Sequence, residues 1–298
     1  VVSPVVPGSV ADKAQTAAVT DLNADSADVN ETVTYTKVGS LVPSSSDGNF
    51  PGAPTVVYPN DPSDATKVTP AGVPTVPGYT AHDPEGHVLT PGSSYQPSDP
   101  TKDTTITYTA DKQKGSVSYV DDTTGKTLKT DSISGTTGSK SSYSTSGSIA
   151  DYKKQGYELV TDGYPADLTF DNDDTTDQNF TVHLKHRLTP VNPTDPQTPG
   201  TPINPDEPDG PKWPTSTNYD KTVNETISYV DQNGHVVAKQ HTDSVNFTRT
   251  VVVDNVTGEV ITSGAGTTAW TATNGDTTFD AVVSPVVPGS VADKAQTA

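Results

Sequence analysis

Short runs in which apolar and polar residues alternate recur along the chain, separated by turns rich in Gly, Pro, Asp and Thr. Successive side chains of a β-strand point to opposite faces, so alternate apolar positions mark the buried face of a strand. Residues 55–111 open with TVVYPND and close with TTITYTAD. This region is predicted to be a β-rich module containing Pro and Gly, with Val57, Ile106 and Tyr108 in its core.

Residues 112–188 show the clearest order of elements. GSVSYVDDTTGKTLKTDSIS predicts two strands around a DDTTGK turn, and SIADYKKQGYELV changes to helical spacing. A helix is expected at about Ser148–Gln155, ended by Gly156 in the position after its C-cap. The predicted inward-facing strand residues are Val117, Tyr119, Leu128, Ile133, Phe180, Val182 and Leu184. Two strands, a helix and further strands resemble a β-grasp arrangement.

Residues 215–298 contain three candidate hairpins. Asn233-Gly234 is the strongest hairpin signal in the chain, because both residues tolerate the positive φ that a tight turn needs. The second candidate closes around Asn255–Gly258, and the third around Asn274-Gly275. The fold class is therefore mostly β with few short helices, in tandem small modules that are expected to be elongated.

The chain repeats itself: Val1–Ala17 and Val282–Ala298 are the same seventeen residues, VVSPVVPGSVADKAQTA. Self-similarity at a fixed period is the mark of a tandem array, and the alternative is a cloning artefact. On the array interpretation, residues 1–38 are the closing segment of a preceding repeat's module, and residues 215–298 form a second module that lacks its closing strand. Residues 18–38 of one molecule are then expected to complete the 215–298 module of another, head to tail, and the alternative is that the incomplete ends are disordered.

Two stretches are expected to be linkers. Residues 39–54 (GSLVPSSSDGNFPGAP) have a loop-like composition, and residues 189–214 carry Pro at every third position from Pro190 to Pro214. That spacing matches the three-residue turn of polyproline II. The second linker is either a semi-rigid extended strut or a flexible spacer.

Composition limits both the core and the partners. Only 30% of residues are hydrophobic and the net charge is −19, so several thin cores are expected instead of one large core. The excess of acidic residues makes nucleic acid a poor partner, because nucleic acid binding needs clustered cations. No apolar run reaches the roughly 18 residues that span a bilayer, so no membrane insertion is expected. The absence of Cys excludes disulfides and thiolate metal sites.

Each of the two modules contains a set of sequence motifs. The first module contains KGSVSYVDDTTGKTL, YKKQGYELV and NFTVHLKHR, and the second contains NETISYVDQNGHVVAKQ and FTRTVVVDNVTGEV. With these motifs the chain resembles the mucus-binding (Mub or MucBP) repeats of lactic-acid-bacterial surface adhesins. The resemblance implies ubiquitin-like β-grasp modules in a Gram-positive, extracellular surface protein whose cell-wall anchor lies outside this segment. It implies weak, multivalent binding of mucin glycoproteins through their glycans, and immunoglobulin binding for some members. The alternative is a stalk or spacer repeat with no ligand of its own.

Catalysis finds little support in the sequence. It has no Cys nucleophile, no Gly-rich phosphate loop and no GxSxG context around its serines, so the protein is predicted not to be an enzyme and to need no cofactor. Because mucins carry sialate and sulfate and the chain is itself acidic, recognition is expected to depend on local contacts.

Three groups of residues are considered as candidate sites. Trp270 and Trp213 are glycan-stacking candidates, although Trp270 also suits a core strand and Trp213 a junction between modules. Asp171, Asp173 and Asp177 resemble a Ca²⁺ loop that lacks the Gly at its sixth position and the Glu at its twelfth, so a solvated acidic loop is the alternative. His183 and His186, three apart on a predicted strand, are expected on opposite faces and at the surface.

Overall fold

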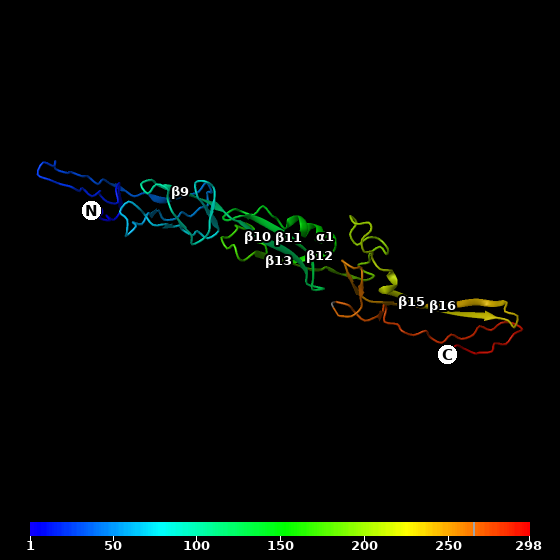
Figure 1. Cartoon of the computed structure of the whole chain (residues 1–298). Coiled ribbons are helices and arrows are strands. Elements are labelled where there is room, and N and C mark those ends of the chain that lie inside the picture. The colour runs from blue at the N-terminus through cyan, green and yellow to red at the C-terminus, as the bar shows by residue number, and fades with distance from the viewer. Residues whose placement is uncertain (265) are drawn as a thin grey trace. The chain divides into compact units, whose positions relative to one another are not determined.

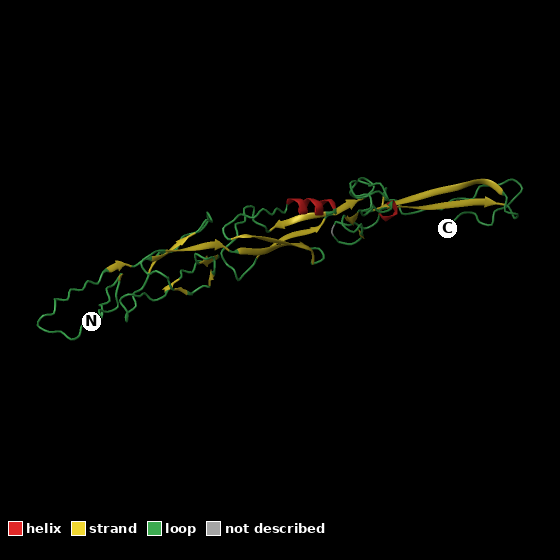
Figure 2. Cartoon of the chain, turned by 45° about the horizontal axis from the view of Figure 1, so that its top comes forward, coloured by secondary structure: helices red, strands yellow, loops and turns green. Residues whose placement is uncertain are grey.

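The computed structural model describes residues 1–264 and 266–298, and it confirms a mostly β chain built from several small sheets (Figures 1 and 2). One α-helix, α1 (Ser146–Lys154), and one short 3₁₀ helix, η1 (Ser216–Asn218), interrupt the strands in the described part. The chain divides into two compact units. The first comprises residues 1–118, 129–144 and 163–181, and the second comprises residues 119–128, 145–162 and 182–298. None of the described helices has the length and apolar character needed to cross a membrane.

The first unit begins with a two-stranded ribbon, followed by a five-stranded sheet in the order β4-β3-β9-β6-β7 and a small β5-β8 pair. The ribbon pairs β1 (Ser9–Ala11) with β2 (Tyr35–Lys37), antiparallel. The sheet is antiparallel except for β3 and β9, which run parallel. The strands are β3 (Ser40–Ser44), β4 (Val56–Val57), β5 (Ala71–Gly72), β6 (Tyr79–His82), β7 (Val88–Leu89), β8 (Ser94–Tyr95) and β9 (Thr104–Ala110).

The prediction that residues 39–54 are a loop-like linker is wrong, because β3 lies inside this range. Leu41 is fully buried in the core of the sheet, and residues 41–44 pair with residues 104–107 of β9. Pro43 is tolerated because β4 pairs only with Ser40 and Leu41, so one side of β3 is open at the proline.

The core of this sheet confirms two of its three predicted residues. Ile106 and Tyr108 are buried, whereas Val57 is 59% exposed. Val56 and Tyr58 face inward in its place, and the Tyr58 hydroxyl bonds Thr104 Oγ1 at 2.6 Å. The predicted phase is therefore wrong by one residue at Val56–Tyr58, and a one-residue shift moves every side chain of a strand to the other face.

A second sheet has the order β11-β10-β13-β12, with α1 between β11 and β12 along the chain. Its strands are β10 (Lys112–Asp121), β11 (Lys126–Thr136), β12 (Tyr157–Asp162) and β13 (Gln178–His186). The predicted helix and the DDTTGK turn are confirmed, and Gly156 follows the helix with φ +100°. Four of the predicted core residues are fully buried and Ile133 nearly so, whereas Leu128 and Phe180 are half-buried. The β-grasp assignment of this module stays a prediction.

The expectation that residues 189–214 are an extended or floppy linker is wrong. Its start forms β14 (Leu188–Val191), which pairs with β17 (Val251–Asp254). The rest folds back on itself through two backbone hydrogen bonds: the Gly200 amide donates to the Trp213 carbonyl at 3.0 Å, and the Trp213 amide donates to the Thr201 carbonyl at 2.9 Å. Val191 is buried, and Ile203 and Trp213 pack against its cluster, so burial of apolar side chains opposes the extended polyproline conformation.

Two of the three predicted hairpins in the second unit are confirmed. β15 (Asp220–Val230) and β16 (Val236–Thr248) form a long hairpin, and β17 pairs with β18 (Val260–Ile261). The third prediction, around Asn274-Gly275, is wrong. Here β19 (Thr271–Ala272) pairs with Phe247 and Thr248 of β16, on the edge of β16 that faces away from β15.

Gly115 in β10 provides a test of the close packing in the second sheet. A Cβ atom at this position would collide with the backbone carbonyl of Gln178, so Gly115→Ala is expected to lower the free energy of unfolding by about 1–3 kcal/mol. Gly147 in α1 has open space around it, and Gly147→Ala should instead stabilise by about 0.4–1 kcal/mol. Amide hydrogen exchange in β10 and β13 measures both effects, and equal effects of the two variants would contradict the packing described.

Candidate functional site

A buried histidine lies between two carboxylates in the second unit. His186, the last residue of β13, places Nε2 2.6 Å from Asp121 Oδ2 and Nδ1 2.7 Å from Asp254 Oδ2. All three side chains are at least nine-tenths buried. A buried charge of this kind persists only when it is paired and hydrogen-bonded. We call Asp121, His186 and Asp254 the ionic triad.

The two aspartates of the ionic triad begin turns of the same sequence type, Asp-x-x-Thr-Gly. Asp121 starts DDTTG and Asp254 starts DNVTG, and in both turns the glycine has φ +76° and its amide donates to the aspartate carbonyl at 2.7 Å. Each carboxylate accepts hydrogen bonds from its own turn through Oδ1, at 2.9 Å from the Thr123 amide and 2.8 Å from the Val256 amide. The other oxygen of each carboxylate is thereby directed at the imidazole.

The hydrogen bonds of the ionic triad shift two pKa values. Burial alone would lower the pKa of His186, but the bonds to Asp254 and Asp121 outweigh it and raise this pKa above its usual value near 6.5. Burial opposes the shift in Asp121 as well, where hydrogen bonds from His186 and from its own turn lower the pKa. The imidazolium is therefore the favoured form at mildly acid pH.

The surface assignment of His186 is wrong, whereas the opposite faces of the two histidines are confirmed. His183 is partly exposed and lies 2.8 Å from Asp122, while His186 continues the buried face of Val182 and Leu184. The alternation of β13 carried this signal, because it places His186 two positions after Leu184. The repeated Asp-x-x-Thr-Gly turn was a second signal.

A hollow of about 390 Å³ opens beside the ionic triad, entirely within the second unit. Four parts of the chain line it: the end of α1 with the two residues that follow, the position after β13, the 203–211 loop and the turn after β17. The lining residues include Lys153, Lys154, Gln155, Gly156, Arg187, Asn204, Glu207, Pro211, Asn255 and Val256. We call it the basic hollow.

Backbone hydrogen bonds join the walls of the basic hollow to one another beside the ionic triad. The Arg187 amide donates to the Gly156 carbonyl at 2.9 Å, and the Asn255 amide donates to the Arg187 carbonyl at 2.9 Å. Arg187 and Asn255 directly follow His186 and Asp254, so the ionic triad sets where these walls lie. Any Cβ atom on Gly156 would collide with the Asn255 backbone, which explains glycine there.

The basic hollow has the opposite charge to the chain as a whole. Lys153, Lys154 and Arg187 line it against one carboxylate, Glu207, in a protein of net charge −19. Over the described residues, none of these three cations forms an ion pair. Unpaired cations around a concavity that also presents amide groups can bind an anionic polar ligand.

The structure separates the two tryptophan candidates. Trp270 is half-buried, with Arg249 Cζ 4.5 Å and Lys221 Nζ 5.1 Å from its ring centroid. Cations over the ring face stabilise such an arrangement. Trp213 packs against the buried cluster of Val191, Tyr219, Val251 and Val253.

Carboxylates of the acidic loop proposed for Ca²⁺ accept hydrogen bonds from backbone amides of the same loop. The Asp173 amide donates to Asp171 Oδ1 at 3.1 Å, and the Thr175 amide donates to Asp173 Oδ1 at 2.9 Å. In the part of the chain that the structure describes, Asp171, Asp173 and Asp177 do not form a three-ligand cluster. Calcium binding by this loop stays a prediction.

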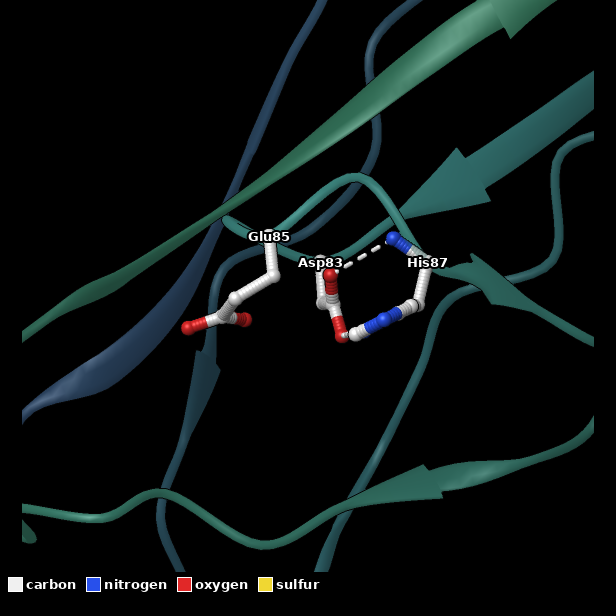
Figure 3. Close-up of side chains that lie close together, drawn as sticks. All are labelled: Asp83, Glu85 and His87. Carbon is white, nitrogen blue, oxygen red and sulfur yellow. Dashed lines mark hydrogen bonds and ion pairs between the residues drawn. The ribbon is translucent and has the colours of Figure 1, made fainter.

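Another group, Asp83, Glu85 and His87, does bring three potential ligand atoms within 4.8 Å of one another. Figure 3 shows Asp83 and His87 facing each other across the turn, with the Glu85 carboxylate on the other side of Asp83. Asp83 accepts hydrogen bonds from the His87 amide at 2.8 Å and faces the His87 ring at 3.1 Å, so its oxygens already serve the turn.

Comparisons with known proteins define the class of the chain. The profile of a mucin binding domain matches residues 113–186, and the profile of a Muc B2-like domain matches residues 214–298. A type 2 repeat of the mucus binding protein MUB from Lactobacillus reuteri is 33% identical over 62% of this chain and 88% of that chain, with a TM-score of 0.41. The crystal structure of Mub-RV is 34% identical over 62% of this chain and 87% of that chain, with a TM-score of 0.45. A search of curated proteins returned no significant match.

The two profiles together span slightly more than half of the chain, and their order agrees with the motifs found in the sequence. The chain therefore belongs to the mucus-binding repeats. Repeats of this family are parts of extracellular surface proteins and are in general not catalytic.

The ionic triad yields a pH prediction. A histidine whose pKa is raised on folding stabilises the fold below its unfolded value near 6.5, and this stability is lost as pH rises through the folded pKa. The lowered pKa of Asp121 contributes stability above about 3.8, which is lost as pH falls through the folded value. The triad's contribution should therefore be greatest between about pH 4 and pH 6.5.

His186→Phe tests this directly, because it leaves two buried carboxylates without their partner. At pH 6 we expect it to lower the free energy of unfolding by about 3–5 kcal/mol and to weaken the pH dependence between 6.5 and 8.5. His183→Phe, at the partly exposed position on the opposite face, is the matched control. Urea unfolding over a pH series measures both, and a wild-type unfolding free energy that rises steadily from pH 6 to pH 8.5 would contradict the account.

Proposed function

We propose that this repeat binds the glycans of mucin glycoproteins as part of a cell-wall-anchored adhesin, and that the basic hollow is its contact site. The supporting observation is the gathering of three unpaired cations around a concavity in a strongly acidic chain. Sialate and sulfate groups of mucins are the anions that such a site would take.

The dimensions of the basic hollow suit one or two sugar units. Its volume of about 390 Å³ lies in the usual range for small-ligand sites. Arg187 offers a planar fork of donors suited to a carboxylate or sulfate, and Lys154 offers a point charge. Gln155 adds a polar side chain able to bond sugar hydroxyls.

Electrostatics explains why binding by one repeat would be weak. The net charge of −19 repels an acidic glycoprotein at long range, and the basic hollow attracts it only at short range. Linking several weak sites raises the overall affinity without any new contact. A surface protein with tandem repeats would gain its adhesion in this way.

Binding to immobilised mucin, before and after enzymatic removal of sialate and of whole glycans, tests the proposal. The double variant Lys154→Glu/Arg187→Glu should weaken binding at least about tenfold, because it replaces two charge-assisted contacts with repulsion. Lys126→Glu makes a charge reversal at the exposed start of β11 and should leave binding within about twofold.

Two outcomes would contradict the assignment to the basic hollow. In the first, the double variant binds as well as the wild type whereas Trp270→Ala abolishes binding. That result would move the glycan site to the Trp270 ring, over which Lys221 and Arg249 lie. The other is binding that survives complete deglycosylation, which would favour a protein ligand such as an immunoglobulin. No binding by wild-type repeats, even when multimerised, would make the repeat a spacer.

A further inference from the structure

The duplicated segment adopts one local conformation in both of its copies. In residues 1–17 the Ser3 amide donates to the Ala14 carbonyl at 2.8 Å, and in residues 282–298 the Ser284 amide donates to the Ala295 carbonyl at 2.9 Å. The glycine of the turn has φ +83° in the first copy and +82° in the second. The seventeen residues therefore specify this conformation locally. We call residues 1–17 the first copy and residues 282–298 the second copy.

The first copy is docked on the first unit. Its strand β1 pairs with β2, so that Val10 lies opposite Thr36, and the Ala11 amide donates to the Ala65 carbonyl at 2.8 Å. Val10 is 4% exposed and belongs to the core of the five-stranded sheet module.

One side chain of that module recognises the turn of the first copy. Asn60 accepts a hydrogen bond from the Gly8 amide at 2.8 Å, and its Nδ2 donates to the carbonyls of Ser9 at 2.8 Å and Val6 at 3.1 Å. The side-chain amide of Asn60 therefore bonds the backbone of the turn at three residues, as an acceptor through its oxygen and as a donor through its nitrogen. Such a set of bonds is specific for this backbone conformation.

The second copy has the same residues but lacks these contacts. Val291, the counterpart of Val10, is 99% exposed, and Val286 is 95% exposed where its counterpart Val5 is 37% exposed. In the described part of the chain, the amide of Ala292 makes no backbone hydrogen bond equivalent to that of Ala11. The second copy is therefore a preformed, uncovered version of a segment whose partner surface is known.

We propose that the second copy docks on a second copy of residues 35–68, through the contacts that Asn60, Ala65 and Thr36 make with the first copy. The occupant is a further repeat of this same chain. Its Tyr35–Lys37 strand pairs with Ser290–Ala292, and its Asn60 binds the turn at Gly289. The duplicated segment is then a joint that fixes each repeat to its neighbour.

The physical case for docking rests on preorganisation. The segment already has its bound conformation, so docking orders few additional residues and loses little conformational entropy. An exposed valine becomes buried, and backbone groups that face water gain partners within the protein. In a tandem chain the partner surface is also tethered close by, which raises its effective concentration.

The absence of Cys from the chain allows a single engineered thiol to test the proposal. Cysteine behaves as a small apolar residue and substitutes for valine with little disturbance, and it reacts with a thiol reagent only when it is exposed. In the 298-residue chain, Val291→Cys should react fast and Val10→Cys slowly, with the same neighbouring sequence. The deciding arm is a two-repeat chain in which residue 298 is followed by a second copy of residues 18–298.

In the two-repeat chain the thiol at Val291→Cys of the first repeat should react at least about tenfold more slowly than in the 298-residue chain, because reaction then requires local opening of the joint. Asn60→Ala in the second repeat should restore fast reaction. Ser63→Ala nearby, whose hydroxyl bonds Asp61, should not. Equal rates in the one-repeat and two-repeat chains would overturn the proposal, whatever the effect of the Asn60 variant on folding.

Discussion

One buried imidazole joins two turns of the second unit through a hydrogen bond at each of its nitrogens. His186 spans two turns of the same Asp-x-x-Thr-Gly type, which come from residues far apart in the sequence, and its two nitrogens bond one carboxylate of each. Neither carboxylate is held by the histidine alone, because each also caps its own turn. The residues that follow the triad, Arg187 and Asn255, form two walls of the basic hollow, so the proposed function depends on the same constraint.

A polar triad in this position is understandable in a chain with so little apolar material. With 30% hydrophobic residues divided among several small sheets, no core is large enough to fix its neighbours by burial alone. Hydrogen bonds with defined directions supply the missing specificity. Tyr58 to Thr104 and Asn60 to the turn of the first copy are examples of the same strategy. Such contacts fix the segments that they join in one arrangement, although each one adds only modest stability.

The sequence predicted correctly the elements whose stabilising contacts lie between residues close together in the chain. The Asn-Gly hairpin, the short helix with its following glycine, and the alternating core of β13 all depend on residues close in sequence, and all three are present. The errors involve contacts between distant segments. Residues 39–54 and 189–214 have the composition of linkers, yet Leu41 and Val191 enter cores made by strands more than fifty residues away.

The candidate site, too, depends on contacts between segments that are far apart in the sequence. The intrinsic chemistry of tryptophan favours Trp213 and Trp270 as candidates. The basic hollow is instead assembled from the end of a helix, one strand end, a folded-back loop and a turn, none of which is distinctive alone. His186 was identifiable from the phase of β13, and its two aspartates from their shared turn sequence. What the sequence could not provide was that both turns meet at one imidazole.

Chemical-shift mapping by NMR tests the central claim most directly, namely that the triad-supported hollow binds acidic glycans. The ¹⁵N-labelled chain would be titrated with a sialylated oligosaccharide and, separately, with its neutral counterpart at pH 6. The account predicts saturable shifts at Lys153–Gly156, Arg187 and Asn255 with the sialylated sugar, and much smaller shifts with the neutral one. Shifts confined to other surfaces, or equal responses to both sugars, would contradict it.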